Sequence, residues 1–383
     1  MEISNGNLIS EKAYMSSKRV FILGAGFSKM AGMPLATDLT NHVFEKYREY
    51  DQKKALEWLD YLQQRIEWLG DGKPKGINIE EVFDLAQFDI ELCKMQQQLC
   101  PLGRNYGDTP WQNAEDIKAW LSDMEDDLRD VILEEQKKAK LEQIKKFSTH
   151  LKSDDVVLTF NYDTLLEESL KQQKKKWYYG FEQEKGHGVK ILKMHGSINW
   201  IMVRREQKDN FKYPLLFEKR DKNIEDHVMQ TPDETEYRIV LLRVPDESLA
   251  GRIENRDLQL GSKQYEIAIA GLGRYKPLSE LKGSGEIWNN ALRALRNCEQ
   301  IYIIGFSLSP FDTMARLHFG GVMMERSKKK EIGLPKITLI DPIAGELKSN
   351  FKKVFGCSAS IDVIEKRGEE VEEVDWSNLL EVA

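Results

Sequence analysis

The sequence has 383 residues, of which 41% are hydrophobic and 31% charged, and its formal net charge is −7. These proportions are typical of a folded globular protein and exclude a disordered or fibrous chain. The negative charge gives no electrostatic reason to expect direct binding to nucleic acid or to a membrane. The lysine runs at 174–176 and 328–330 are interpreted as charge at helix ends or in solvated loops.

The chain shows no sign of a membrane segment or of a metal module. Its first twenty residues contain no continuous apolar segment, and no stretch approaches the roughly 20 apolar residues needed to cross a bilayer. A cytoplasmic protein is therefore expected. The four cysteines form no CxxC pair and accompany no histidine cluster, so neither a zinc module nor a disulfide framework is indicated and no metal is expected.

Five short apolar runs rich in β-branched residues are spread along the chain, and such runs are typical of parallel strands buried on both faces. Segments with helical spacing of apolar residues lie between most of them. The alternation predicts an α/β, Rossmann-like doubly wound parallel sheet. The expected strands are Val20–Leu23, Val156–Phe160, Lys190–Met194, Ile301–Phe306 and Ile337–Asp341.

Two long segments interrupt this pattern. The first lacks convincing strands and is dense in Leu, Glu, Lys and Gln, which predicts a helical insertion. The second mixes charges, prolines and short β-like pieces such as Arg238–Val244. The expected organisation is a core of residues 18–46, 152–200 and 284–345, a helical insertion at 47–151, a mixed α/β insertion at 201–283 and a C-terminal segment at 346–383.

The first expected strand runs directly into the turn Gly24-Ala25-Gly26. Glycines at such a turn let backbone N–H groups approach a pyrophosphate, although a tight strand-to-helix connection would also use them. A dehydrogenase fingerprint would place a third glycine where this chain has Lys29, and would place an acidic residue at the end of the second strand. A hydride-transfer enzyme is therefore disfavoured.

Polar residues follow the next two expected strands. Asn161 and Asp163 come after one strand, and His195 comes after the other, at the carboxyl edge where open α/β sheets bind ligands. A histidine there is suited to general base catalysis near neutral pH. Asp163 is equally well explained as a helix start, a lone histidine is more often structural, and His187 is a competing histidine in a loop.

The last two expected strands also end in small or polar residues. Gly305 and Ser307 follow one of them, and Asp341 ends the other. Each residue alone is compatible with ordinary turn chemistry. Five polar strand ends in one chain instead favour a shared crevice at the edge of the sheet.

Together, GAGFSKMAGMP, TFNYD, HGS, GFSLS and LID occur in the order of the nucleotide-binding motifs of sirtuins. They most resemble the sirtuin-like domains of bacterial antiphage NAD hydrolases. The resemblance covers the first strand and the segments at about 155–200 and 285–345, and leaves the two insertions unexplained. It implies catalysis by Asn161 and His195, and NAD binding by Gly24, Ala25, Gly26, Ser28, Asp163, Gly305, Ser307 and Asp341.

The chain departs from protein-deacylating sirtuins at three points. Leu35-Ala36-Thr37 replaces the expected Asp-Phe-Arg, Phe160 replaces a glutamine, and the four-cysteine zinc site is absent. These departures favour hydrolysis of NAD, as substrate, to nicotinamide and ADP-ribose, by the effector of an antiphage system that depletes NAD. A non-hydrolytic NAD or ADP-ribose sensor and an NAD-dependent protein deacylase are the alternatives.

The resemblance also implies partners. A homo-oligomer is expected, together with a HerA-like hexameric ATPase or, alternatively, a short Argonaute. The chain lacks the nucleotide-binding pattern GxxxxGK[ST], so any nucleic-acid sensing is expected in that partner.

Overall fold

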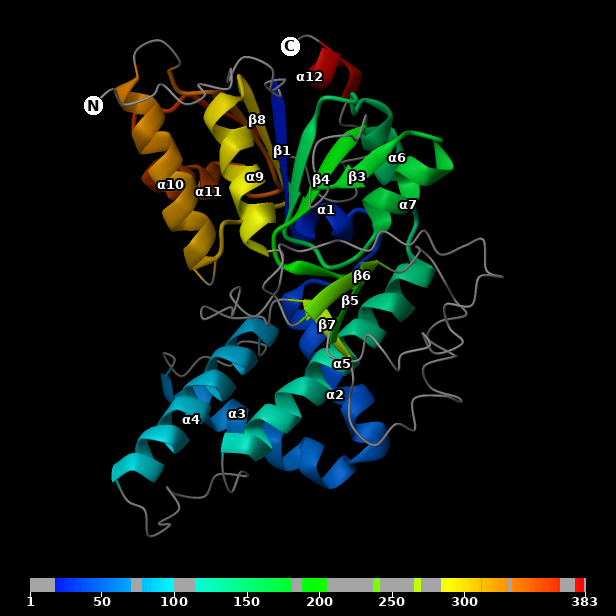
Figure 1. Cartoon of the computed structure of the whole chain (residues 1–383), viewed down its shortest axis with the longest axis vertical. Coiled ribbons are helices and arrows are strands. Elements are labelled where there is room, and N and C mark those ends of the chain that lie inside the picture. Colours follow the sequence, from blue (N-terminus) through cyan, green and yellow to red (C-terminus); the bar gives the residue numbers. More distant parts are fainter. Residues whose placement is uncertain are drawn as a thin grey trace, which may run out of the picture.

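A seven-stranded sheet forms the centre of the computed structural model (Figure 1), and all of its strand pairs are parallel. This architecture confirms the predicted α/β, Rossmann-like fold. The strand order is β10-β9-β8-β1-β2-β4-β3, so β1 is the point at which the chain changes direction across the sheet. The structure describes residues 18–69, 78–99, 114–180, 188–204, 237–241, 265–269, 284–310, 312–329, 333–365 and 376–381.

The five predicted strands are all present in this sheet, each within one or two residues of its expected ends. They are β1 (Arg19–Leu23), β2 (Val156–Thr159), β4 (Val189–Lys193), β8 (Gln300–Ile304) and β9 (Lys336–Ile340). Two short edge strands complete the sheet. β3 (Trp177–Tyr179) adds to one side, and β10 (Ile361–Ile364), from the segment 346–383, adds to the other.

Helices cover the sheet and bury its apolar strands. The β1 residues Val20 to Leu23 are at most 1% exposed, which explains their continuous apolar run. Phe21 stacks on Tyr302 of β8 with ring centroids 5.1 Å apart. The helices of this part are α1 (Ala25–Lys29), α6 (Glu142–Thr149), α7 (Leu165–Gln172), α9 (Ser284–Asn297), α10 (Thr313–Lys328), α11 (Ala344–Phe355) and α12 (Trp376–Glu381).

The segment predicted as a helical insertion contains only helices in its described part. They extend away from the sheet in Figure 1 and pack through aromatic contacts such as Trp58 against Trp120, whose ring centroids lie 4.1 Å apart. Arg129 of α5 donates from Nε to the carbonyl of Ile198 at 3.1 Å and so ties the insertion to the strand (residues 196–204) that follows His195. Its helices are α2 (Ala36–Tyr50), α3 (Gln52–Leu69), α4 (Ile79–Leu99) and α5 (Ala114–Lys138). Most of α2 lies within the range 18–46 expected for the core, whereas α6, within the expected insertion, packs against α7.

A second, antiparallel sheet has the order β6-β5-β7. β5 (Gly196–Arg204) begins directly after His195, inside the range expected to belong to the core. β6 (Tyr237–Leu241) overlaps the predicted β-like piece, and β7 is Tyr265–Ile269. Residues 205–236, 242–264 and 270–283 lie outside the described part of the chain.

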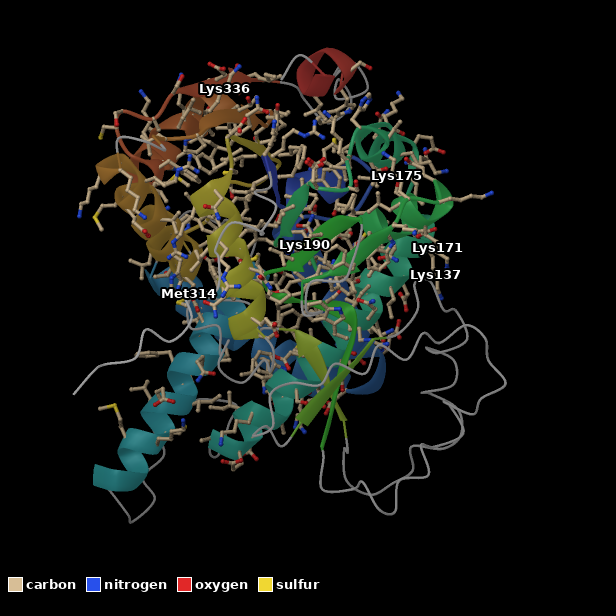
Figure 2. The ribbon with its side chains drawn as sticks, turned by 45° about the horizontal axis from the view of Figure 1, so that its top comes forward. Lys137, Lys171, Lys175, Lys190, Met314 and Lys336 are labelled. Carbon is tan, nitrogen blue, oxygen red and sulfur yellow. The ribbon has the colours of Figure 1, made fainter. Side chains whose placement is uncertain are left out.

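Lysines lie at several helix ends, as predicted for the run at 174–176. Lys137 and Lys171 occupy the last turns of α5 and α7, where cations complement the helix dipole (Figure 2). Lys175 donates from Nζ to the carbonyls of Ser148 at 2.9 Å and Leu151 at 2.8 Å, and burial lowers its pKa. Among the described helices, none is long and apolar enough to cross a membrane.

Candidate functional site

A cavity of about 670 Å³ lies at the carboxyl ends of β1, β2, β4, β8 and β9. Its position at the strand switch around β1 is the usual ligand site of open α/β sheets, and its volume lies within the ordinary range of ligand sites. All ten residues predicted from the sequence line it. They are Gly24, Ala25, Gly26, Ser28, Asn161, Asp163, His195, Gly305, Ser307 and Asp341.

The two glycine loops pack against each other at backbone distance. Gly24 donates its N–H to the carbonyl of Ile304 at 3.1 Å, and Gly26 donates to Gly305 at 2.9 Å. A Cβ on Gly24 would lie 2.5 Å from the carbonyl oxygen of Gly305, which itself has a φ of +58°. Close packing therefore accounts for these glycines, and two N–H groups expected to face a pyrophosphate already donate within the protein.

The helix after the first loop, α1, has only five residues. A helix this short contributes little dipole, so phosphate binding here would depend on individual N–H groups and on Ser28. The apolar pattern that predicted a helix after the loop belongs to α2, which enters the helical insertion.

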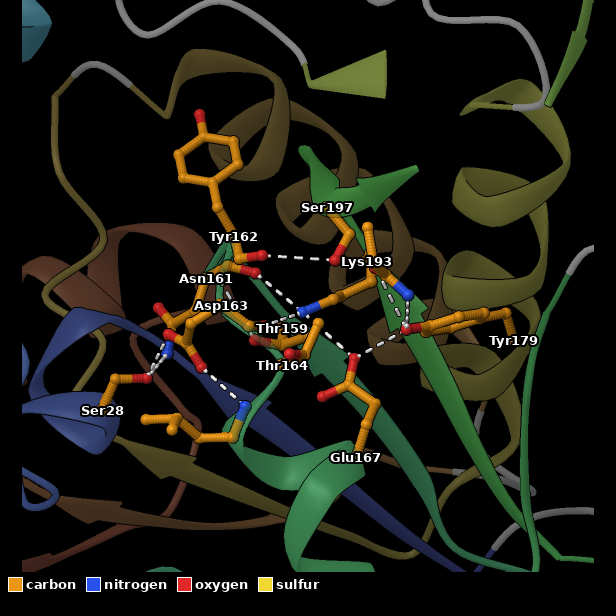
Figure 3. Close-up of polar contacts among 12 residues, drawn as sticks. Ser28, Thr159, Asn161, Tyr162, Asp163, Thr164, Glu167, Tyr179, Lys193 and Ser197 are labelled. Carbon is orange, nitrogen blue, oxygen red and sulfur yellow. Dashed lines mark hydrogen bonds and ion pairs between the residues drawn. The ribbon is translucent and has the colours of Figure 1, made fainter. Parts of the chain in front are cut away.

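Asn161, Ser28 and Asp163 form one buried hydrogen-bond network (Figure 3). Asn161 donates from Nδ2 to Gly24 O and to Ser28 Oγ, both at 2.8 Å, and Ser28 donates to Asp163 Oδ2 at 2.6 Å. Because Gly24 O can only accept, the atom facing it must be the amide nitrogen. Oδ1 of Asn161 is thus the amide atom left to accept from a ligand in the cavity.

Asp163 has a second contact, which corresponds to the alternative interpretation raised from the sequence. Its Oδ1 accepts from the N–H of Leu165 at 3.1 Å, at the start of α7. The carboxylate therefore positions Ser28 and the first turn of a helix. Asp163 supports Asn161 through Ser28.

His195 lies opposite a carboxylate that sequence reasoning did not select. Its Nε2 is 3.5 Å from Asp312 Oδ1, and both side chains are 7% exposed. Phe160 packs edge-on against the imidazole with ring centroids 4.9 Å apart, and Phe306 stacks on Phe160. A histidine oriented by an acid in a largely apolar wall is the arrangement of a general base. Asp312 lies five residues after Ser307 in the sequence and is the residue at the N-terminus of α10.

The helical insertion supplies one wall of the cavity. Asn78, Ile79 and Glu80, at the start of α4, line it, and Ser309 donates to Glu80 Oε2 at 3.4 Å. Tyr162 also lines the cavity, and burial, together with Glu80 and Asp312, raises its pKa well above the usual value. Its hydroxyl therefore stays neutral. No local sequence pattern marked Glu80, because only the packing of the insertion brings it to the site.

Ser307 and Asp341 also line the cavity. Ser307 is exposed. Asp341 accepts from the N–H of Ile343 at 3.0 Å, and burial raises its pKa. Within the described residues, no group of His, Cys, Asp and Glu side chains is arranged to hold a metal ion.

Comparison with known proteins gives one family. No curated protein matches the chain. The family model described as bacteriophage abortive infection AbiH matches residues 20–323, a span that begins in β1 and includes every predicted site residue except Asp341. Since this match covers well over half of the sequence, the chain belongs to the bacteriophage abortive infection family AbiH.

Proposed function

We propose that this chain hydrolyses NAD to nicotinamide and ADP-ribose, and that the loss of NAD is its contribution to abortive infection. One observation carries the proposal: Asn161 and the His195–Asp312 pair converge on a cavity at the switch point of a Rossmann-like sheet. The family match supports the defence role. The sirtuin-like order of the motifs supports the choice of NAD.

The reaction needs little from the protein at the leaving group. The bond between ribose C1′ and the nicotinamide nitrogen breaks, and its electron pair neutralises the cationic pyridinium ring, so no acid is required. Positive charge then develops on the ribose, and Oδ1 of Asn161 is suited to stabilise it and to orient a water. The water oxygen bonds to C1′, and His195 takes the proton.

Asp312 gives His195 its orientation in this scheme. Because the carboxylate faces Nε2, it favours the tautomer that carries the proton there and leaves the lone pair on Nδ1. Phe160 and Phe306 exclude water from one side of the pair. The developing charge is thereby met by fixed protein groups in place of mobile solvent.

Nicotinamide release tests the proposal. The purified chain is incubated with NAD, alone and with the product of its neighbouring gene, and the products are separated by chromatography. We expect His195→Ala to lower the rate by about 100-fold or more. His42→Ala removes an exposed histidine of α2 that does not line the cavity, and should leave the rate unchanged.

The results separate the alternatives. Equal rates for wild type and His195→Ala would refute the assignment of the base. NAD binding measured by calorimetry without any nicotinamide release would favour a sensor. The homo-oligomer and the HerA-like or Argonaute partner remain predictions, and the assay with the neighbouring gene product tests whether a partner is required.

A further inference from the structure

The segments that carry Asn161 and His195 are joined by an unusual set of contacts. Three consecutive carbonyl oxygens, those of residues 161–163, all accept from residues 193–198 (Figure 3). Lys193 donates from Nζ to the carbonyls of Asn161, at 3.2 Å, and of Asp163. Ser197 Oγ and the N–H of Ile198 donate to the intervening carbonyl at 3.2 and 3.1 Å. In the sequence, His195 lies midway between Lys193 and Ser197.

The charge of Lys193 is buried and fully partnered. Its side chain and that of Glu167 on α7 are each 1% exposed, and Nζ lies 3.2 Å from Oε1 of Glu167. Tyr179 of β3 donates its hydroxyl to the same carboxylate oxygen at 3.0 Å. An ammonium has three N–H donors, and the two carbonyls and Glu167 provide three acceptors.

Stability alone does not explain such a pair, because well-packed apolar residues commonly replace buried ion pairs without loss of stability. The position of the Lys193–Glu167 pair in the fold offers another explanation for it. The ammonium holds the backbone on both sides of Tyr162, and it is anchored two residues before His195 on the neighbouring strand. A shift of β4 against β2 would therefore have to break these contacts, which hold the segment of Asn161 against the segment of His195.

We propose that Lys193, Ser197 and Glu167 form a positioning clamp that fixes Asn161 relative to His195. The proposal rests on the proposed function for its effect on turnover, whereas its effect on the backbone is independent of any reaction. Lys193 and Glu167 act through the carbonyls of residues 161 and 163 and do not line the cavity. They position the catalytic residues without contacting the substrate.

The test removes the charges in pairs, so that no buried charge is left alone. In Lys193→Met/Glu167→Gln, we expect kcat for NAD to fall about 10- to 100-fold with KM changed less than about threefold, because misplacement by an ångström is that costly. Hydrogen exchange at the amides of residues 161–165 should also accelerate.

The chain offers a matched control. Arg19 and Asp155 form another buried ion pair, 2.6 Å apart, at the ends of β1 and β2 that lie away from the cavity. Whatever its effect on thermal stability, Arg19→Met/Asp155→Asn should change neither kcat of the folded protein nor exchange at residues 161–165. A merely structural role for Lys193 predicts the same behaviour for both double variants.

Each result decides the proposal. Unchanged kcat and unchanged exchange at residues 161–165 in the folded Lys193→Met/Glu167→Gln protein would overturn the clamp. If that protein does not fold, Ser197→Ala replaces it as the test, because this variant removes only one hydroxyl. We then expect a three- to tenfold lower kcat and faster exchange at residues 161–165. Wild-type values of both would overturn the clamp. If the wild-type chain releases no nicotinamide either alone or with the product of its neighbouring gene, the proposed function fails, and the exchange comparison still decides the clamp.

Discussion

Gly24→Ala distinguishes two reasons for the glycine that follows β1. Gly24 is extended, with φ −119° and ψ −172°, a conformation that any residue adopts, so only space demands a glycine. The new Cβ would lie 2.5 Å from Gly305 O and 2.6 Å from the Cα of Phe306. Both are backbone atoms, so no rotamer change relieves the contact. The two loops must separate by roughly 1 Å, since ordinary contact begins at 3.4 Å.

The cost follows from this overpacking. Forcing a methyl group into a packed site costs about 1–3 kcal/mol. Alanine also lowers the conformational entropy of the unfolded chain, which stabilises the folded state by about 0.4–1 kcal/mol. For a chain of 383 residues, a net loss of about 1–2 kcal/mol corresponds to a fall in Tm of about 1–3 °C.

The measurement is thermal unfolding without any nucleotide, followed by circular dichroism. Gly321→Ala is the control, because Gly321 lies inside α10 with no atom within 4 Å of a new Cβ. Alanine is favoured over glycine in a helix by about 1 kcal/mol, so the Tm of this variant should not fall. If Gly24→Ala unfolds at the wild-type temperature and only NAD binding weakens, the packing explanation is wrong and the glycine serves the ligand alone.

Three further predictions concern the carboxylates of the cavity and the thiols. Asp312→Asn should lower kcat about 100-fold with little change in KM, since it keeps the shape of the side chain but removes the charge that orients His195. An unchanged pH–rate profile in this variant would exclude that role for Asp312. Burial raises the pKa of Cys298 to about 11, so at pH 8 iodoacetamide should label the exposed Cys357 first and Cys298 only after unfolding, as mass spectrometry would show. Because the folded pKa lies above the unfolded one, the contribution of this thiol to stability is lost as pH rises from about 9 to 11. Asp341 should repel the 2′-phosphate of NADP. In competition assays, Asp341→Asn should therefore reduce the preference for NAD over NADP about tenfold. An unaltered preference would mean that the adenosine ribose binds elsewhere.

The sequence alone was sufficient to predict the centre of the fold and the edge that carries the site. Buried parallel strands are continuous apolar runs, and this local property identified β1, β2, β4, β8 and β9. The carboxyl ends of parallel strands meet at one edge, so the residues that follow each run could be assigned to one crevice from the sequence pattern. All ten of them line the cavity.

Short or amphipathic elements escaped prediction because their pairing is decided by distant segments. β3 has only three residues, and β10 lies in a segment without a continuous apolar run. The same reason applies within the site. Glu80 reaches the cavity only because the helical insertion packs over it. Asp312, at the N-terminus of α10, becomes a partner of His195 only when the fold brings that helix end to the residues that follow β4.

The roles of individual residues depended most on the tertiary structure. The sequence placed Asn161 and His195 after two predicted strands, whereas the structure showed that these strands are neighbours in the sheet. The structure also decided which amide atom of Asn161 is left for a ligand and that the Lys193 ammonium binds the Asn161 carbonyl. Lys193 was part of a predicted strand, and its sequence neighbours gave no reason to expect a buried ammonium. Local patterns determine where a strand begins and ends; hydrogen-bond partners separated by more than thirty residues are determined only by the packing that brings them together.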